Sequence, residues 1–297
     1  MFELEPVGFS KLSATEKADQ MCKDTIKNIL DYGSLDINPR PKYKDGTPAH
    51  TLSINHIFHS YNLDKGEFPL LSLRPIAVKS AIGEILWIYQ DESNNLDLLK
   101  DKYNVTWWDE WEVENTRTIG ACYGETIRRS NQMRKLLDQI EKDPDSRRHI
   151  LSLWQVKDFD EPHGLKPCAL YSQYNIRHEK DGDYMDGFTM LRSSDYLTAG
   201  CINQVQYIAL LMMIARHTGY KVGKFTCGFI NCQIYDRHIE NAKIMLERES
   251  VPANPKIILN PEKKDFYDIT IDDFKIVDYP REEIKNKNPQ LTFELGI

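Results

Sequence analysis

Apolar residues recur at helical spacing in three stretches of the chain. The first begins after the Ser-Ala-Thr-Glu pattern at residues 13–16, which is typical of a helix N-terminus, and ends at Gly33. The second covers residues 76–88 and follows a proline, which suits the first turn of a helix. The third covers residues 204–217 and stops at Gly219. These patterns predict one amphipathic helix and two strongly apolar ones.

Strand-forming residues lie between these helices, separated by polar turns. The predicted strands are residues 51–54, 149–154, 169–177, 184–192 and 222–235. Residues 39–50 are basic and rich in turn-forming residues, so a flexible loop is expected there. Another helix is predicted at residues 236–249. This mixture predicts one α+β domain over residues 1–297, built on a mainly antiparallel sheet.

Composition narrows the class of partner. A chain of 297 residues with 41% hydrophobic content and no internal repeats can bury one large core. The 38 basic and 45 acidic residues give a formal charge of −7, so long-range attraction to a nucleic acid is not expected. Any anionic ligand must therefore be held by arginines that lie close to it.

The cysteines and the apolar runs bear on the compartment. The six cysteines have neither the spacing of a zinc site nor the density of a disulfide scaffold, which favours reduced thiols, a cytoplasmic protein and no metal. Residues 1–10 carry acids and a proline where a signal peptide would be basic and then apolar. Charges interrupt every long apolar segment, so we expect no membrane span.

A possible nucleophile stands close to groups that could bind a nucleotide. Cys168 follows a proline, and Arg192, Ser193, Asn203 and Tyr235 come after it. A thiolate attacks carbon, an arginine fork binds phosphate, and an amide can pair with both the carbonyl and the N–H of a uracil-like edge. Together these residue types indicate covalent chemistry on a nucleotide.

Taken singly, each of these residues has an ordinary structural explanation. A free cysteine such as Cys168 is most often a buried thiol, and the adjacent Arg147 and Arg148 are most often a solvated surface pair. Asn203 at the start of an apolar helix could be a plain N-cap. The Trp107, Trp108 and Trp111 side chains could be core residues or a stacking surface for a flat heterocycle. Only the joint pattern of these residues distinguishes a nucleotide site from ordinary structural roles.

The joint pattern resembles the thymidylate synthase family from near Arg40 to the C-terminus. The motifs that carry the resemblance are Gly83-Glu84-Ile85-Leu86-Trp87, Trp108-Asp109-Glu110-Trp111, Tyr123-Gly124, Asp145-Ser146-Arg147-Arg148, Leu165-Lys166-Pro167-Cys168, Arg192-Ser193-Ser194-Asp195, Asn203 and Ile234-Tyr235. The resemblance implies a mixed sheet flanked by helices, with one sheet face used for dimerisation. It also implies reductive methylation of dUMP to dTMP, with 5,10-methylenetetrahydrofolate as co-substrate and dihydrofolate as product.

The same resemblance implies a role for each site residue. Cys168 would add to C6 of the uracil, Glu84 would organise proton transfer, and Tyr123 would line the cysteine side. Arg192 and Ser193 would bind the phosphate, Asn203 the base, and Gln233 and Tyr235 the sugar; Trp108, Leu165 and Asp195 would hold the folate, with Asp195 also facing the nucleotide. Arg147 and Arg148 would reach the phosphate across a homodimer interface, and residues 290–297 would close over the site.

Five positions depart from the family pattern. They are Ala169 after the nucleophile, Gln233 for a sugar-binding histidine, Gly46 for a loop arginine, Asn231 for an aspartate and Cys201 for a proline. Glutamine can still donate a hydrogen bond, so we expect weaker rather than absent sugar binding. One of Arg40, Lys42 and Lys44 must replace the loop arginine.

Two other functions are compatible with these motifs. A nucleotide hydroxymethylase of the same fold would complete the reaction with water instead of hydride, but Asn203 disfavours its cytosine-specific branch, and Trp108 favours retention of the folate. A non-catalytic, RNA-binding homologue should have lost Cys168 or the arginines, and the net negative charge gives it no footprint for nucleic acid.

Overall fold

A six-stranded mixed sheet forms the centre of the fold. It is seen in a computed structural model that describes residues 11–297. The strand order is β1-β2-β6-β5-β4-β3, and every neighbouring pair is antiparallel except β5 and β6, which are parallel. The strands are β1 Ser34–Leu35, β2 Thr51–Asn62, β3 Ile150–Ser152, β4 Ala169–Glu179, β5 Gly182–Asp195 and β6 Lys221–Tyr235. The predicted α+β class with a mainly antiparallel sheet is confirmed.

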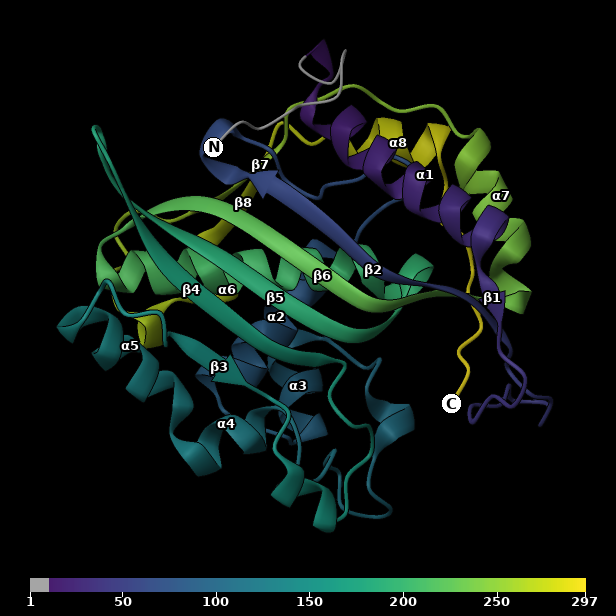
Figure 1. Ribbon diagram of the computed structural model, residues 1–297, viewed down its shortest axis with the longest axis horizontal. Helices are drawn as coiled ribbons and strands as arrows, with labels where there is room; N and C mark the ends of the chain where they lie inside the picture. The colour runs from purple at the N-terminus through teal and green to yellow at the C-terminus, as the bar shows by residue number, and fades with distance from the viewer. Residues whose placement is uncertain (1–10) are drawn as a thin grey trace.

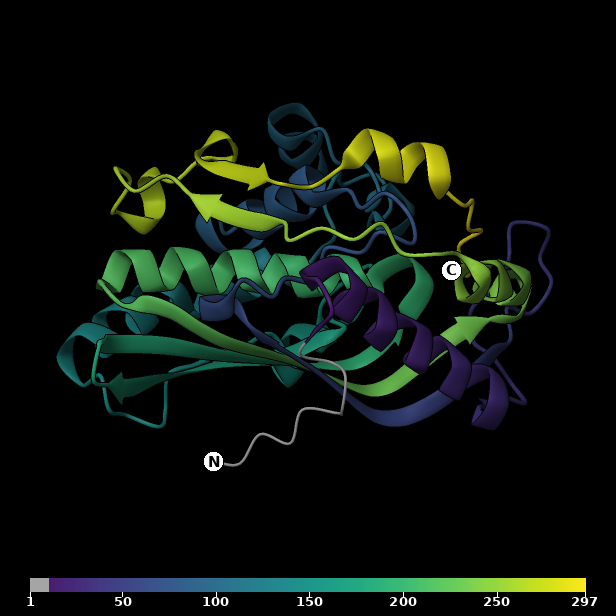
Figure 2. The same ribbon diagram turned by 90° about the horizontal axis from the view of Figure 1, so that it is seen from above.

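Helices and a small second sheet cover one face of these strands. The helices are α1 Ala14–Tyr32, α2 Val78–Ile85, α3 Leu96–Tyr103, α4 Gly124–Ser130, α5 Gln132–Lys142, α6 Cys201–Thr218, α7 Ile239–Glu247 and α8 Arg281–Lys287. Figure 2 shows α6 lying along the sheet, with the two-stranded sheet of β7 Lys256–Leu259 and β8 Phe274–Val277 further out. Figure 1 looks onto the opposite face of β4, β5 and β6, which these helices leave open.

Helix α6 is the core of the domain because it is apolar on nearly all sides and most of its residues are buried. Together with the turn before it, it spans residues Tyr196–Thr218, and an 18-residue window of this stretch has a mean hydropathy of 1.4, long and apolar enough to cross a bilayer. The sequence-based statement that charges interrupt every long apolar segment is therefore wrong for this stretch. However, 78% of this window is buried inside the fold, which is the pattern of a core helix.

The other local predictions meet the structure to different degrees. Ser13 caps α1, and its backbone N–H donates to the Glu16 carboxylate at 2.8 Å, so the capping box is confirmed. Strand β2 is three times as long as the four residues expected, because it pairs with β6 along its whole length. Helix α2 ends at Ile85 and continues as a wider turn to Gln90. The expectation for residues 1–10 lies outside the described part.

Two segments far apart in sequence meet beside β6. The backbone of Lys42, in the basic loop, exchanges hydrogen bonds of 2.8 and 2.9 Å with Ile297. Arg237 donates to Asp45 in the same loop and to Glu294 near the C-terminus, both at 2.7 Å. Loop 39–50 and segment 290–297 thus form one continuous wall at the C-terminal end of β6. The predictions that the loop is mobile and the tail closes, and that residues 1–297 are one domain, stay predictions.

Candidate active site

A cavity of about 790 Å³ opens between the sheet, the N-terminal end of α6, helix α2 and the loop-and-tail wall. Most of the predicted site residues line it: Glu84, Trp108, Tyr123, Leu165, Cys168, Arg192, Ser193, Asp195, Asn203, Gln233 and Tyr235. Cys168 is the one of the six cysteines that does so; all six are described and unpaired. Arg147 and Arg148 are exposed and do not line this cavity.

Backbone hydrogen bonds on both sides fix the position of Cys168, at the start of β4. Its N–H donates to the Tyr123 hydroxyl at 2.9 Å, and its carbonyl accepts from the backbone N–H of Arg192 at 2.7 Å. The Arg192 guanidinium donates to the carbonyls of Pro167 and Lys166 at 2.9 and 2.8 Å. The loop before the thiol is therefore held by the same arginine that the sequence assigned to phosphate.

The electrostatics of the thiol have two opposing parts. Burial raises the pKa of Cys168, while the positive charge of Arg192 and a hydrogen bond from Tyr123 lower it. The upward effect prevails, so the positive charge of Arg192 does not by itself produce a strongly acidic thiol.

Tyr123 reaches Cys168 from an unusual backbone conformation. Its φ is +52°, which is uncommon for a residue with a Cβ and is stabilised only where surrounding contacts impose it. Next to it, a Cβ on Gly124 would lie 2.0 Å from the carbonyl oxygen of Ser93, so only glycine permits this close approach. The Tyr-Gly pair noted in the sequence therefore has a steric reason.

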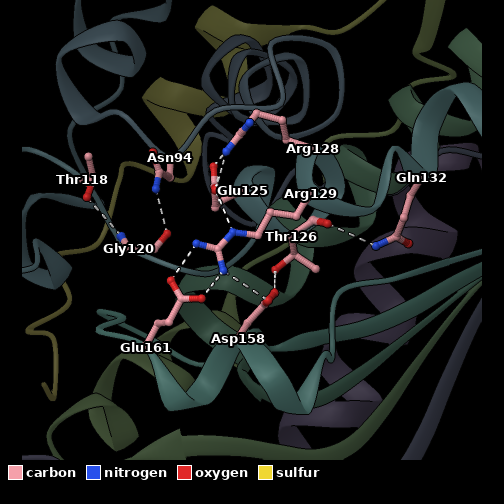
Figure 3. Close-up of polar contacts among 10 residues, drawn as sticks. All are labelled: Asn94, Thr118, Gly120, Glu125, Thr126, Arg128, Arg129, Gln132, Asp158 and Glu161. Carbon is pink, nitrogen blue, oxygen red and sulfur yellow. Dashed lines mark hydrogen bonds and ion pairs between the residues drawn. The ribbon is translucent and has the colours of Figure 1, made fainter.

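A polar network ties α4 to the segment that leads to Cys168 (Figure 3). Arg129 of α4 donates to both oxygens of Glu161, at 2.5 and 2.7 Å, and to Glu125 at 2.8 Å. Thr126 donates to the Asp158 carboxylate in the same segment. Backbone bonds from Ala121 to the carbonyl of Pro162 and from Gly164 to that of Ile119 continue the pairing. Tyr123 and Cys168 thus sit on two segments fastened to one another.

The structure bears on which basic residue of loop 39–50 could replace the loop arginine of the family. Arg40 lines the cavity, whereas Lys44 lies 3.6 Å from the Glu110 carboxylate and Lys42 is not among the lining residues. The positive charge of Arg40 also acts on the buried hydroxyl of Tyr235, whose pKa burial raises to about 12. Of the three candidates, Arg40 is the one placed to meet a ligand in this cavity.

Glu84 is a carboxyl group in an almost apolar environment. It is 7% exposed on α2, and burial raises its pKa to about 7. The indole N–H of Trp107 donates to its Oε2, and Gln206 on α6 also contributes a hydrogen bond that lowers the pKa. A carboxyl group that titrates near neutrality can accept and return a proton during a reaction.

Asn203 lies in the first turn of α6, and its amide N–H₂ donates to the buried Oε1 of Gln206 at 2.9 Å. The N-cap position is Gly200, so the ordinary interpretation of Asn203 as an N-cap is wrong. Because Gln206 also faces Glu84, the asparagine and the glutamate are linked through one side chain.

Several buried polar atoms around the cavity have no partner within the described chain. Both carboxylate oxygens of Asp195 and the indole nitrogen of Trp108 are among them, and the nearest basic group to Asp195 is His238 at 3.9 Å. Burial raises the pKa of Asp195, opposed by His238. Buried donors and acceptors in native proteins are nearly always satisfied, so these atoms suit a ligand that brings its own polar groups, as a pterin does.

Some lining residues were not anticipated. Arg74 is 4% exposed, donates to the carbonyl of Leu197 at 2.7 Å and faces the ring of Phe293 at 5.6 Å. Phe293, Leu295 and Gly296 bring the C-terminal segment into the cavity wall. An arginine within the apolar run at residues 70–76 was the available signal for Arg74. No local signal identified Gln206 or the contact of Trp107 with Glu84.

In the described residues, no three His, Cys, Asp or Glu side chains are grouped to hold a metal ion. The cavity instead joins a thiol to arginine side chains, an amide side chain and a carboxyl that titrates near pH 7. Enzymes that modify nucleotides through a cysteine nucleophile combine these groups, and the cavity is compatible with that class.

Comparison with known proteins agrees with this class. The family model for thymidylate synthase matches residues 20–289. The thymidylate synthase of Streptococcus sanguinis is 48% identical over 94% of this chain and 99% of its own length, and that of Streptococcus pyogenes is 46% identical over 95% and 99%. The structure of the thermostable thymidylate synthase A of Bacillus subtilis covers 94% of this chain and 99% of its own, with a TM-score of 0.84 and 36% identity.

The chain belongs to the thymidylate synthase family. The resemblance, the fold and the enzyme class expected from the sequence, a methyltransferase that uses methylenetetrahydrofolate as co-substrate, are thereby confirmed. The comparisons favour neither the hydroxymethylase nor the non-catalytic alternative.

Proposed function

We propose that this protein makes dTMP by reductive methylation of dUMP, with Cys168 as the nucleophile. The observation that carries the assignment is the placement of Cys168, Arg192 and Asn203 on one cavity. Addition of the thiolate to C6 of the uracil makes C5 nucleophilic, which replaces one difficult substitution by easier steps. The folate supplies both the one-carbon unit and the hydride.

The nucleotide is bound at three points. Arg192 and Ser193 hold the phosphate, joined by Arg40 from the loop. Asn203 reads the base: its Oδ1 accepts from N3–H, and the amide hydrogen not used by Gln206 donates to O4. Tyr235 and Gln233 contact the sugar from β6. The sequence departures at Gln233 and Gly46 therefore alter single contacts and leave the binding mode intact.

Folate stacks on the other side of the base. Trp108 packs edge-on against Tyr123 at 4.9 Å and against Trp111 at 5.6 Å, which gives a rigid aromatic wall. Leu165 adds apolar surface, and the unpaired carboxylate of Asp195 accepts hydrogen bonds from the pterin N–H groups. The tail residues Phe293 and Leu295 complete this wall. Closure excludes water and so favours hydride transfer over hydration.

The enzyme is a homodimer formed through the open sheet face. That face carries Phe58, which is 55% exposed, and the rings of Tyr171 and Phe188, 6.0 Å apart. A Cβ on Gly228 would lie 3.0 Å from both Phe58 and Met190, so apolar side chains from neighbouring strands meet closely at this point of the face. Exposed apolar patches of this kind mark association surfaces. Arg147 and Arg148 are exposed and complete the phosphate site of the second protomer.

Subunit complementation tests the shared site. Each inactive variant, Cys168→Ser and the double variant Arg147→Ala with Arg148→Ala, should regain activity when the two are unfolded and refolded together. Random pairing gives half mixed dimers, each with one intact site, so about a quarter of the parent activity is expected in an isologous dimer. Recovery of no activity above that of the separate variants would contradict the sharing of arginines.

The assignment as a whole is tested with dUMP and methylenetetrahydrofolate. Dihydrofolate is followed by its absorbance while mass spectrometry identifies the nucleotide. Methylated product in equal amount to dihydrofolate supports the proposal, and hydroxymethylated product without dihydrofolate would move the assignment to a hydroxymethylase. A cytoplasmic location is part of the proposal because all six thiols are unpaired, as expected in a reducing compartment.

A further inference from the structure

The indole of Trp107 makes the most specific polar contact with the buried Glu84. Trp107 follows α3 in a loop, and its Nε1–H donates to Oε2 of Glu84. Glu84 is 7% exposed, and Trp107 lines the same cavity. A carboxylate in such a site is stable only if donors replace its lost hydration. The contact is therefore of the kind that controls ionisation, rather than a surface hydrogen bond.

We propose that Trp107 is a positioning residue for proton transfer: its indole N–H holds Oε2, stabilises the ionised carboxylate of Glu84 and leaves Oε1 to exchange protons with the reacting nucleotide. This rests on the proposed function, in which Glu84 takes part in proton transfer. Trp107 itself touches neither reacting atom. It acts only through the carboxylate that it orients.

The surroundings of Glu84 show that few other groups can play this part. The titratable groups that face it are Tyr89, Tyr123 and Cys168, and burial raises the pKa of each. These groups are neutral near pH 7, so they add no charge there. Arg192, the cation nearby, acts on Cys168 and is not among the influences on Glu84. Hydrogen-bond donors are left as the means of keeping Glu84 ionised.

Of the donors that lower the pKa of Glu84, Trp107 is the one whose direct hydrogen bond to this carboxylate is seen among the described residues, and it has no second partner there. Gln206 also accepts from Asn203, so its orientation depends on the base-reading amide. Trp108 also lowers the pKa of Glu84, but its buried indole nitrogen makes no hydrogen bond of normal geometry within the described residues. The N–H of Trp107 points at Glu84 alone among the described contacts. Its removal should therefore change the ionisation of Glu84 without removing a contact to either substrate.

The sign of the effect follows from these contacts. Burial raises the pKa of Glu84 to about 7, even with the donors in place. Loss of a donor to the ionised form raises it further, by about one to two pH units. If the ionised form is the working form, the acidic limb of the kcat/KM profile moves up by the same amount, and at pH 7 kcat/KM falls to between about a tenth and a hundredth of its high-pH plateau.

The experiment compares Trp107→Phe with the parent protein in two measurements. The first is the pH profile of kcat/KM for dUMP, with Glu84→Gln to identify the limb that belongs to this carboxyl. The second is infrared difference spectroscopy of the protonated carboxyl band without substrates, again assigned with Glu84→Gln. Trp111→Phe is the matched control, because it removes an indole from the same loop that does not donate to Glu84; its carboxyl should titrate where the parent's does.

An upward shift in both measurements for Trp107→Phe, absent in the control, supports the inference. An unchanged carboxyl titration in a folded variant would overturn it while leaving the proposed function untouched. If the carboxyl band shifts in Trp107→Phe but the pH profile of kcat/KM keeps its acidic limb in Glu84→Gln, the proposed role of Glu84 in proton transfer is wrong instead. Trp107→Leu serves in the same assays if the phenylalanine variant unfolds below the assay temperature.

Discussion

Replacement of Cys168 by serine is expected to lower kcat by about 10⁴-fold or more, since the step that activates the base is lost. The variant should bind dUMP within about threefold of the parent, because the change removes no contact to phosphate, sugar or base edge. The backbone at this position is held by Tyr123 and Arg192 through main-chain atoms, so the side chain can change without moving the loop. Steady-state kinetics and titration calorimetry with dUMP measure the two quantities.

Cys122→Ser is the matched control for this prediction. Cys122 is buried, does not line the cavity, and its thiol donates to the Ile119 carbonyl at 3.1 Å, a bond that a hydroxyl can replace. It should retain parent-like turnover. A Cys168→Ser protein that turns over at more than a tenth of the parent rate would exclude covalent catalysis by this thiol. Loss of both dUMP binding and turnover would instead indicate that the substitution disrupts the structure of the site.

A feature of the fold could be predicted from the sequence where residues close together in the chain determine it. The start of α1 is determined by Ser13 and Glu16, which are three positions apart, and the prediction there is confirmed. The left-handed Gly219 that ends α6 is equally local. The length of β2 has no local cause. Its residues beyond the expected strand are extended because they pair with β6, which lies more than 160 positions away in the sequence. The alternation of polar and apolar residues in β2 is too weak to show this.

The site shows the same division. Cys168, Arg192 and Asn203 stand in motifs that the chain carries in full, and they meet on one cavity. The choice of Arg40 over Lys44 could not be made from the sequence, because Lys44 is turned towards Glu110 by tertiary contacts. The hydrogen bond between Trp107 and Glu84 joins residues from two separate elements. Such contacts depend on side-chain direction, which spacing along the chain does not encode.

Asn203→Asp is expected to reverse the base preference, lowering the ratio of kcat/KM for dUMP to that for dCMP by about 10³-fold or more. In the parent, the amide donates to one side and accepts on the other, which matches the O4 and N3–H of uracil. An ionised aspartate only accepts, so it repels O4 and attracts the exocyclic amino group of cytosine. Competition between the two nucleotides in one assay, with products separated by mass, gives the ratio directly.

The neighbour of Asn203 makes this prediction more specific. Its amide donates to Oε1 of Gln206, and an aspartate would place two acceptors 2.9 Å apart unless Gln206 turns over. A turned glutamine donates to the aspartate, and the donor that lowers the pKa of Glu84 is then lost. The variant should therefore show both the changed preference and an acidic limb at higher pH. Asn203→Ala removes base reading without reversing it. This variant should lower kcat/KM for both nucleotides and change the ratio of the two values far less. If Asn203→Asp rejects dCMP as strongly as the parent does, the base is read by another group.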